Sequence, residues 1–420
     1  MGKLRTMRYI PGGPMIIIGI LFFVFGFITW LGTVLIPYLK IACELNNFES
    51  YLVTFSFYIS YFVMAIPSAW VLSKTGYKKG ISLGLIIMSA GTFIFIPAAL
   101  HRNYLIFLVG LFIQGTGLAI LQTAANPYVT ILGPRKSAAK RISIMGICNG
   151  IAGVSAPLIL GALMLSKADY INDTIRSLDR VARENMLDNL AHKVIFPYLV
   201  MMCGLFLLAV MVFFSSLPEL NTEPEMREND TITLPARKCI LQYPHFIWGV
   251  VSLFFYVGVE VIAIDTIISY ASSQGIPLST GKFYSSLTLV NMLAGYIGGI
   301  ILIPKHLSQE RALKICAVAG IIFSTGALFF SGVTSILFIS LLGLANSLIW
   351  PSIWPLATNG LGVHLKKGSA FMIMAIGGGA LLPLLYGKIA DLYSAHSAYW
   401  LLVPCYVVII YYAFKEYRPR

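Results

Sequence analysis

Two acidic residues, Glu260 and Asp265, lie inside one long apolar segment and are the side chains most able to do chemistry. The other fifteen of the seventeen acids fall in polar loops, in tails or at the ends of apolar segments. A charge at the centre of a bilayer costs about 2.5–3.5 kcal/mol on insertion scales, and no Lys, Arg or His lies at that depth. We therefore expect a proton or cation site here, with a neutral, hydrogen-bonded packing role as the alternative.

The spacing of the two acids limits how they can act together. Five residues turn a regular α-helix by about 500°, so the two carboxylates point ~140° apart. We expect them to share one ion only where this helix is broken.

Uncharged polar and aromatic residues inside the other apolar segments form a second candidate set. Amide groups both donate and accept hydrogen bonds, which suits a neutral polyol, and indole rings offer flat apolar faces for a sugar. The polar residues are Thr33, Gln114, Gln122, Asn126, Asn149, Asn291 and Asn346, and the deeply placed tryptophans are Trp30, Trp350 and Trp354. For each amide, a hydrogen bond between helices is the alternative interpretation.

The composition tells what kind of chain holds these residues. Of its 420 residues, 58% are hydrophobic and 11% are charged, whereas globular domains carry roughly 25% charged residues. This excludes a soluble fold. No Ser/His/Asp, Cys/His or metal-ligand cluster stands out, and the six cysteines show no metal or redox spacing, so we expect no enzyme activity, no metal and no cofactor.

Twelve apolar segments are long enough to cross a bilayer, which takes about 20 residues. They cover residues 14–42, 51–73, 80–100, 104–132, 141–166 and 195–217, then 245–273, 280–303, 310–332, 334–362, 366–390 and 395–414. The sequence therefore predicts an all-α polytopic membrane protein with two six-helix bundles, 1–217 and 245–420. The polar, acidic stretch 218–244 is the expected cytoplasmic linker.

The basic residues predict the orientation. With the N-terminus inside, 21 of the 30 Lys and Arg residues fall in inner loops and tails, as the positive-inside rule requires. We expect both termini to be cytoplasmic, in the cytoplasmic membrane. The net charge of +13 is then a topology signal, and we expect a lipid bilayer and no nucleic acid as partner.

The two halves resemble each other at a constant offset of 232 residues. FFVFGFITWLGTVLIPY from Phe22 and FFYVGVEVIAIDTIISY from Phe254 share five residues. Repeated halves are typical of transporters that bind substrate between them near the midplane. At this offset Thr33 corresponds to Asp265.

Several motifs resemble one family. QTAANPYVTILGP (122–134), YVGVE (256–260), WPSIWPLA (350–357) and MAIGGGALLPLLYG (374–387) are similar to the fucose/hexose permeases, the fucose–proton symporter family of the major facilitator superfamily. The resemblance implies the major facilitator fold, sugar transport and a monomer.

Two departures from the family pattern affect the expected coupling. The resemblance implies acids in the first and fourth helices of the proton-coupled fucose permeases, but these positions hold Thr33 and Gln122 here. This points to the glucose/galactose branch, in which Gln122 and Asn149 would face the sugar. We hypothesise that coupling has moved to the seventh helix, with Asp265 as the cation carboxylate and Glu260 as its helper or a sugar ligand.

We therefore expect a symporter that imports a hexose, glucose or galactose first, together with sodium or a proton. The expected sugar contacts are Trp30, Thr33, Gln122, Asn126 and Asn149 in the first half and Asn291, Asn346, Trp350 and Trp354 in the second. A fucose-type permease or an uncoupled facilitator is the alternative within transport. A membrane receptor would need a soluble output domain, and a membrane transferase would need a polar catalytic cluster.

Overall fold

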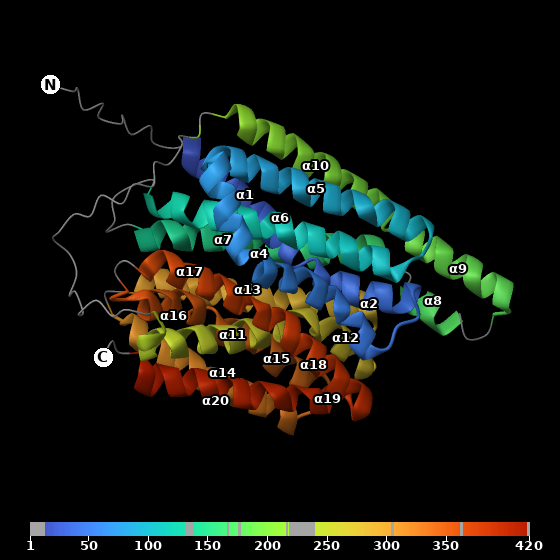
Figure 1. The fold of residues 1–420 in the computed structure, drawn as a ribbon. Coiled ribbons are helices and arrows are strands. Elements are labelled where there is room, and N and C mark those ends of the chain that lie inside the picture. Colours follow the sequence, from blue (N-terminus) through green and yellow to red (C-terminus); the bar gives the residue numbers. More distant parts are fainter. Residues whose placement is uncertain are drawn as a thin grey trace.

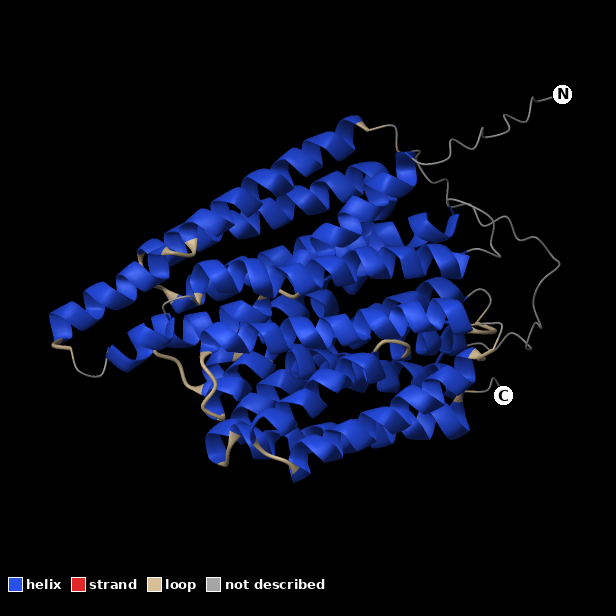
Figure 2. Ribbon diagram, turned by 180° about the vertical axis from the view of Figure 1, so that it is seen from behind, coloured by secondary structure: helices blue, strands red, loops and turns tan. Residues whose placement is uncertain are grey.

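The computed structural model of the chain describes residues 13–131, 138–165, 168–174, 178–215, 217, 240–303, 306–361 and 364–417. All regular elements in these ranges are helices, as Figure 2 shows. Twelve helical segments among them are long and apolar enough to cross a membrane. The expected twelve-helix, all-α architecture is confirmed.

The first half holds six spans. They are built from α1 (Gly13–Thr29) with α2 (Gly32–Ala42), α4 (Leu52–Thr75), α5 (Tyr77–Leu100), α6 (Tyr104–Ile131), α7 (Ala138–Met164) and α10 (Ile195–Phe214). Three short helices connect them: α3 (Asn47–Ser50), α8 (Ala168–Thr174) and α9 (Arg180–His192).

The second half holds the other six. They are α11 (Pro244–Asp265) with α12 (Ile267–Ser273), α13 (Leu278–Leu302), α14 (Gln309–Phe329), α15 (Gly332–Asn346) with α16 (Ile349–Thr358), α17 (Leu365–Met374) with α18 (Gly378–Leu392), and α20 (Leu402–Tyr411). The short elements η3 (Ile240–Gln242), η5 (Ala375–Gly377), α19 (Ala395–Ala398), η6 (Tyr399–Leu401) and η7 (Tyr412–Glu416) complete it.

The two halves lie one above the other in Figure 1, the first in blue and green and the second in yellow to red. They meet through α7 against α13, α4 against α17 and α18, and α2 against α11 and α12. Of the expected linker 218–244, only residues 240–244 are described. The boundary between the two bundles therefore stays a prediction.

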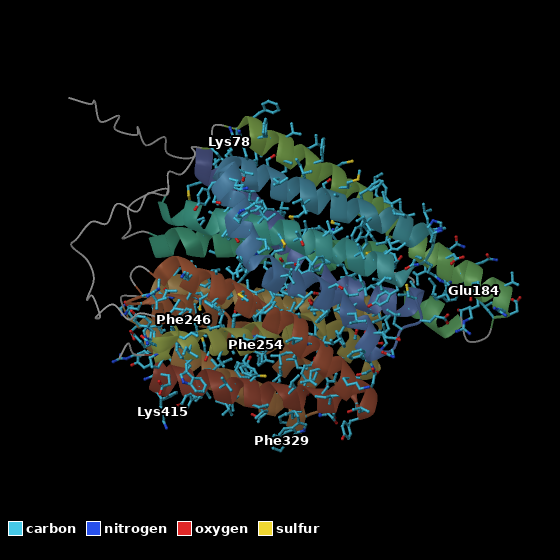
Figure 3. The ribbon with its side chains drawn as sticks, in the orientation of Figure 1. Lys78, Glu184, Phe246, Phe254, Phe329 and Lys415 are labelled. Carbon is cyan, nitrogen blue, oxygen red and sulfur yellow. The ribbon has the colours of Figure 1, made fainter. Side chains whose placement is uncertain are left out.

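The bundle has two ends, which we name for the rest of the text. The terminal side is the end at which α1 begins and α20 finishes, on the left of Figure 1; the distal side is the end that carries α9, α12 and α19. Figure 3 places Lys78 and Lys415 toward the terminal side and Glu184 at the distal tip. Charged side chains thus mark both ends of an apolar bundle.

Four of the spans are interrupted, the eleventh by η5 between α17 and α18, and the interruptions of the first and seventh spans face each other. The first span breaks at Trp30 and Leu31, between α1 and α2, and the seventh at Thr266, between α11 and α12. The tenth span breaks before α16, four residues ahead of Pro351. The missing N–H and the ring of Pro351 disrupt the helix at the residue four positions earlier, which is Ser347. Discontinuous helices of this kind commonly line transporter sites.

Candidate functional site

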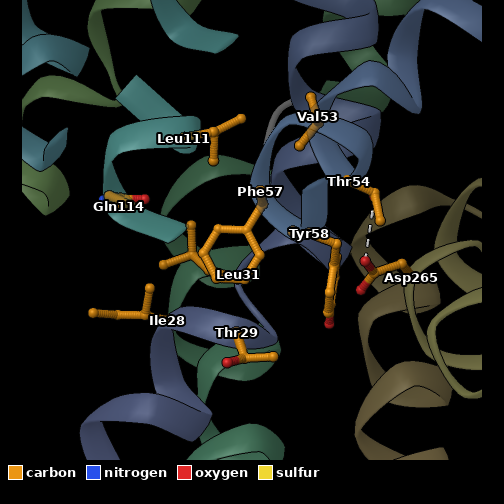
Figure 4. A pocket seen from close by; sticks show the side chains of 11 residues that line it. Ile28, Thr29, Leu31, Val53, Thr54, Phe57, Tyr58, Leu111, Gln114 and Asp265 are labelled. Carbon is orange, nitrogen blue, oxygen red and sulfur yellow. Dashed lines mark hydrogen bonds between the residues drawn. The ribbon is translucent and has the colours of Figure 1, made fainter. Parts of the chain in front are cut away.

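Asp265 is the last residue of α11 and lies against the first half of the chain. Its side chain is buried, at 1% exposure. The Thr33 hydroxyl donates a hydrogen bond of 2.9 Å to Oδ1, and the Thr54 hydroxyl donates one of 3.3 Å to Oδ2, drawn in Figure 4. A Cβ atom on Gly32 would lie only 3.3 Å from Oδ2, so the missing side chain of Gly32 lets the carboxylate approach α2 closely.

The bond between Thr33 and Asp265 joins two equivalent positions of the repeat. The two residues are 232 positions apart, which is the offset that aligns the two halves. Equivalent residues that touch must lie near the pseudo-two-fold axis that relates the halves. The buried carboxylate therefore lies where the two bundles meet, and its hydrogen-bond donors both belong to the opposite bundle.

No basic side chain neutralises Asp265 within the described residues, where all the ion pairs lie at the distal end of the first half. Burying an ionised carboxylate without a partner is costly. A bound proton or cation would offset this cost. The same ranges contain no group of three or more His, Cys, Asp or Glu that could hold a metal ion, so the donors at Asp265 are one carboxylate and hydroxyls.

A small cavity of about 10 Å³ adjoins Asp265. Thr54 and Tyr58 line it beside the carboxylate, and Gln114 lies on the opposite side in Figure 4. Roughly 10–15 Å³ is needed for one water molecule. The space suits a water or an unhydrated cation and is too small for a hexose, so the sugar site must lie elsewhere.

Glu260 belongs to a different cluster, one turn and a half earlier on α11. The Tyr256 hydroxyl donates a hydrogen bond of 2.8 Å to its Oε1. The Tyr256 ring lies 6.4 Å from that of Trp350, which stacks on Trp354 at 5.4 Å. Glu260 and Asp265 share no hydrogen-bond partner in the described part of the chain, and helix α11 is unbroken between them. The two acids therefore occupy separate places, and Glu260 is adjacent to the expected sugar-binding indoles.

In the first half, Gln122 and Asn149 are both partly exposed. The Gln122 amide donates a 3.2 Å hydrogen bond to the Tyr61 hydroxyl, and the Asn149 amide donates one of 3.4 Å to the Phe22 carbonyl. Each bond uses one donor and leaves the amide oxygen available to a ligand. Asn126 belongs to α6, but its side chain lies outside the described residues.

Three other candidates make contacts between helices. Asn291 donates a 3.0 Å hydrogen bond to the Ser340 carbonyl, and buried Asn346 accepts one of 2.8 Å from Tyr406. The Trp30 indole is 5% exposed and packs on residues of the second half, among them Ile264. Their sugar-binding roles remain predictions, and Trp30 now lies between the bundles.

The sequence reasoning missed a polar stripe that runs from Tyr51 along α4. Tyr51, Thr54, Tyr58 and Tyr61 recur at intervals of three and four residues, so they share one helix face. Thr54 binds Asp265 and Tyr61 binds Gln122. The spacing could have identified this face, but hydroxyl side chains are common contacts between membrane helices and carry a weaker signal than acids.

The interface between the halves is sealed on the distal side. Thr33, Asp265 and Tyr51 are at most 2% exposed, whereas Trp350 and Gln122, nearer the terminal side, are partly exposed. The halves are thus in close contact distally, whereas Gln122 and Trp350, two of the expected sugar contacts, are only partly buried.

A cluster that we call the distal latch holds this closure. The Asp391 carboxylate, at the end of α18, accepts hydrogen bonds of 3.0 Å from the Asn47 N–H, 2.7 Å from the Asn47 side chain and 2.7 Å from the Phe48 N–H. Lys40 donates a 2.5 Å bond to the Asn47 side-chain oxygen. The latch connects the second half to the start of α3 in the first.

Comparisons with known proteins agree with this architecture. The family model described as "Major Facilitator Superfamily" matches residues 18–371. The chain is 32% identical over 398 residues to a "Glucose/galactose transporter" of Brucella abortus, covering 94% of this chain and 91% of that protein. It is 29% identical over 413 residues to the "L-fucose-proton symporter" of Escherichia coli, covering 97% and 93%.

A solved structure is also similar over the full length. It is the crystal structure of a Major Facilitator Superfamily transporter, FucP, in the outward conformation. The TM-score is 0.73 and the sequence identity 28%, over 97% of this chain and 99% of that one.

Proposed function

The chain belongs to the major facilitator superfamily, and we propose that it imports a hexose together with a cation by alternating access between its two halves. It is a multi-pass membrane transporter, not an enzyme. Relatives that carry the name glucose/galactose transporter support glucose and galactose as the first sugars to test. The fucose–proton symporters support the proton as one of the two cations, with sodium as the other.

One observation carries the coupling proposal: the buried carboxylate of Asp265 comes from one bundle and its donors, Thr33 and Thr54, come from the other. When the distal side opens, these contacts separate and the carboxylate meets water. When it closes, an ionised carboxylate is buried without a basic partner. A bound proton or cation removes that cost and favours closure. Asp265 would therefore couple ion binding to the movement of the halves.

The sugar would bind toward the terminal side of Asp265. Gln122 and Asn149 offer amides from the first half, and Trp350, with Trp354 stacked on it, offers an indole face from the second. Glu260 lies beside this face through Tyr256. We assign it to the sugar hydroxyls rather than to the ion, because a carboxylate accepts two hydrogen bonds from a polyol.

The basic residues support a cytoplasmic terminal side. In this orientation, in the cytoplasmic membrane, the structure corresponds to a transporter closed toward the outside. We propose that the protein acts as a monomer, as its resemblance to the fucose/hexose permeases implies.

The test is sugar uptake into proteoliposomes with sodium and proton gradients imposed separately. We expect one gradient to drive accumulation in the native protein. Asp265→Asn should abolish accumulation but retain sugar exchange at equal concentrations, because the amide keeps the shape without binding the ion. Glu310→Gln is the matched control. It changes an acid at the terminal end of α14 and should leave accumulation unchanged.

Different outcomes separate the alternatives. Accumulation driven by neither gradient would leave an uncoupled facilitator. An Asp265→Asn protein that still accumulates sugar with unchanged ion dependence would refute the role of Asp265. Transport of fucose in place of glucose and galactose would support the fucose-type permease.

A further inference from the structure

A second, larger cavity lies between the halves at the distal side. We call it the distal chamber; its volume is about 270 Å³. Pockets for drug-sized ligands run from roughly 300 to 1,000 Å³, so the chamber is of a size for a smaller ligand such as a single sugar ring. Lys40, Asn47 and Tyr51 line it from the first half, and Ser269, Ser272 and Ser273 from the second.

The chamber is separated from the expected sugar site by buried side chains. Its floor includes Tyr51 and Tyr386, whose rings meet edge to face at 5.5 Å. Tyr386 in turn contacts Tyr399, which shares a 2.6 Å hydrogen bond with Thr266, the residue after Asp265. All three tyrosines are at most 2% exposed. A ligand in the chamber therefore cannot be the ligand held by Gln122 and Trp350.

The lining of the chamber has the chemistry of a site for a neutral polyol. It offers the hydroxyls of three serines, the Asn47 amide and the Lys40 ammonium. The three tyrosines of the lining are buried, and the hydroxyls of Tyr270 and Tyr386 already bond other groups. Hydroxyls and amides both donate and accept hydrogen bonds, and tyrosine rings add apolar faces. Among the residues that the structure describes, no carboxylate lines the chamber, and Lys40 would repel a cation. The lining therefore fits a sugar better than the coupling ion.

We propose that the distal chamber is a second sugar-binding site, of low affinity, that slows transport when external sugar is abundant. The inference rests on the proposed function, in that the ligand is taken to be the transported hexose. It adds a site and a regulatory effect that hexose transport alone does not require.

Transport slows because only the state closed on the distal side contains the complete chamber. Both halves supply lining residues, and the distal latch of Asp391, Asn47 and Phe48 holds those halves together beside it. The chamber is complete only while the distal side is closed. A ligand that binds one state stabilises that state, so sugar in the chamber delays reopening toward the outside, the step needed for the next import.

Initial uptake of D-glucose and D-galactose into proteoliposomes, measured over a wide range of external sugar, tests this proposal. In the native protein we expect uptake to rise, pass through a maximum and then fall by at least twofold at about one hundred times the half-saturating concentration. Ser272→Ala with Ser273→Ala removes two hydroxyls from the chamber. This double variant should saturate without the fall and keep the native half-saturating concentration.

Matched controls separate the chamber from general effects. Ser73→Ala removes an exposed serine whose hydroxyl bonds the carbonyl three residues earlier, as that of Ser273 does, but which lies on α4 away from the chamber. It should retain the fall. Ala395→Leu fills the chamber from a partly exposed lining position and should remove the fall in uptake at high sugar. Ala162→Leu, at an exposed position of α7, should retain that fall.

The failure of this proposal is distinguishable from failure of the proposed function. Absence of uptake for both sugars at every concentration would reject hexose transport. Uptake that saturates normally in the native protein, or a fall that persists in both chamber variants, would overturn the second site while leaving transport intact.

Discussion

Exchanging Thr33 and Asp265 tests whether the cation site lies on the axis between the halves. The two side chains are 2.9 Å apart and occupy equivalent positions of the repeat. The exchanged protein, Thr33→Asp with Asp265→Thr, moves the carboxylate to α2 and the hydroxyl to α11. If position in the interface matters more than the helix that carries the acid, coupled transport should return in the double variant.

The single variants set the expected magnitude. Asp265→Thr leaves no carboxylate in the site and should lose gradient-driven accumulation. Thr33→Asp places two carboxylates about 4 Å apart, where two ionised groups repel by roughly 4 kcal/mol at an effective dielectric constant near 20. That corresponds to about a thousandfold change in an equilibrium, so one of the two acids should stay protonated. We expect this variant to lose most coupled uptake, because the retained proton changes the number of ions that the site can exchange.

The assay is the ratio of internal to external sugar in proteoliposomes under the gradient that drives the native protein. Both single variants should give a ratio near one. The exchange should raise that ratio at least fivefold, because neighbouring residues in one network show interaction energies of 0.5–3 kcal/mol in such cycles. Size-exclusion profiles and melting temperatures identify variants that fail to fold.

Two results would contradict the reasoning. The first is a double variant that folds but does not accumulate sugar, while Asp265→Asn still exchanges sugar at equal concentrations. It would show that the acid must be carried by α11. Full accumulation by Asp265→Thr alone would show that the carboxylate does not bind the coupling cation.

Two further substitutions test the packing and the closure of the interface. Gly153→Ala would put a Cβ 2.5 Å from Cδ1 of Trp30. We expect this overpacking to lower the stability by about 1–3 kcal/mol, measured as a lower melting temperature in detergent. Gly146→Ala, on the same helix but with no atom within 4 Å of the added Cβ, should leave the melting temperature unchanged. Asp391→Asn weakens hydrogen bonds to a charged acceptor, worth about 1.5–3 kcal/mol each, and should speed distal labelling of an Ala390→Cys probe at least threefold. Unchanged labelling would show that the latch does not hold the distal side closed.

The sequence predicted the cation candidates because charge is scarce in this chain. An intramembrane acid is costly and therefore conspicuous, and only Glu260 and Asp265 met that description. The repeat also places Thr33 and Asp265 at equivalent positions of the two halves, and the structure shows them in contact. These arguments were possible because a single residue type, or a fixed offset, carried the information; the cation role of the two acids stays a prediction.

The partners of these acids could not be predicted in the same way. Thr54 looks like an ordinary contact between helices, and only the packing of α4 against the second half shows that it meets Asp265. Asp391 lies at a helix end, where acids are unremarkable in sequence. Its role in the distal latch depends on how the two bundles meet, which no local pattern specifies.

On the proposed role of Asp265, the energetics of one buried carboxylate require an ion and a sugar together. Neutralising an acid such as Asp265 in the closed interface is worth about 2.5–3.5 kcal/mol on insertion scales. Moving a two-state equilibrium from 1:99 to 99:1 takes about 5.5 kcal/mol. The cation alone therefore supplies roughly half of the shift, and the remainder must come from contacts that the sugar makes with both halves. A transporter arranged in this way changes state efficiently only when both ligands are bound, which is the requirement for symport.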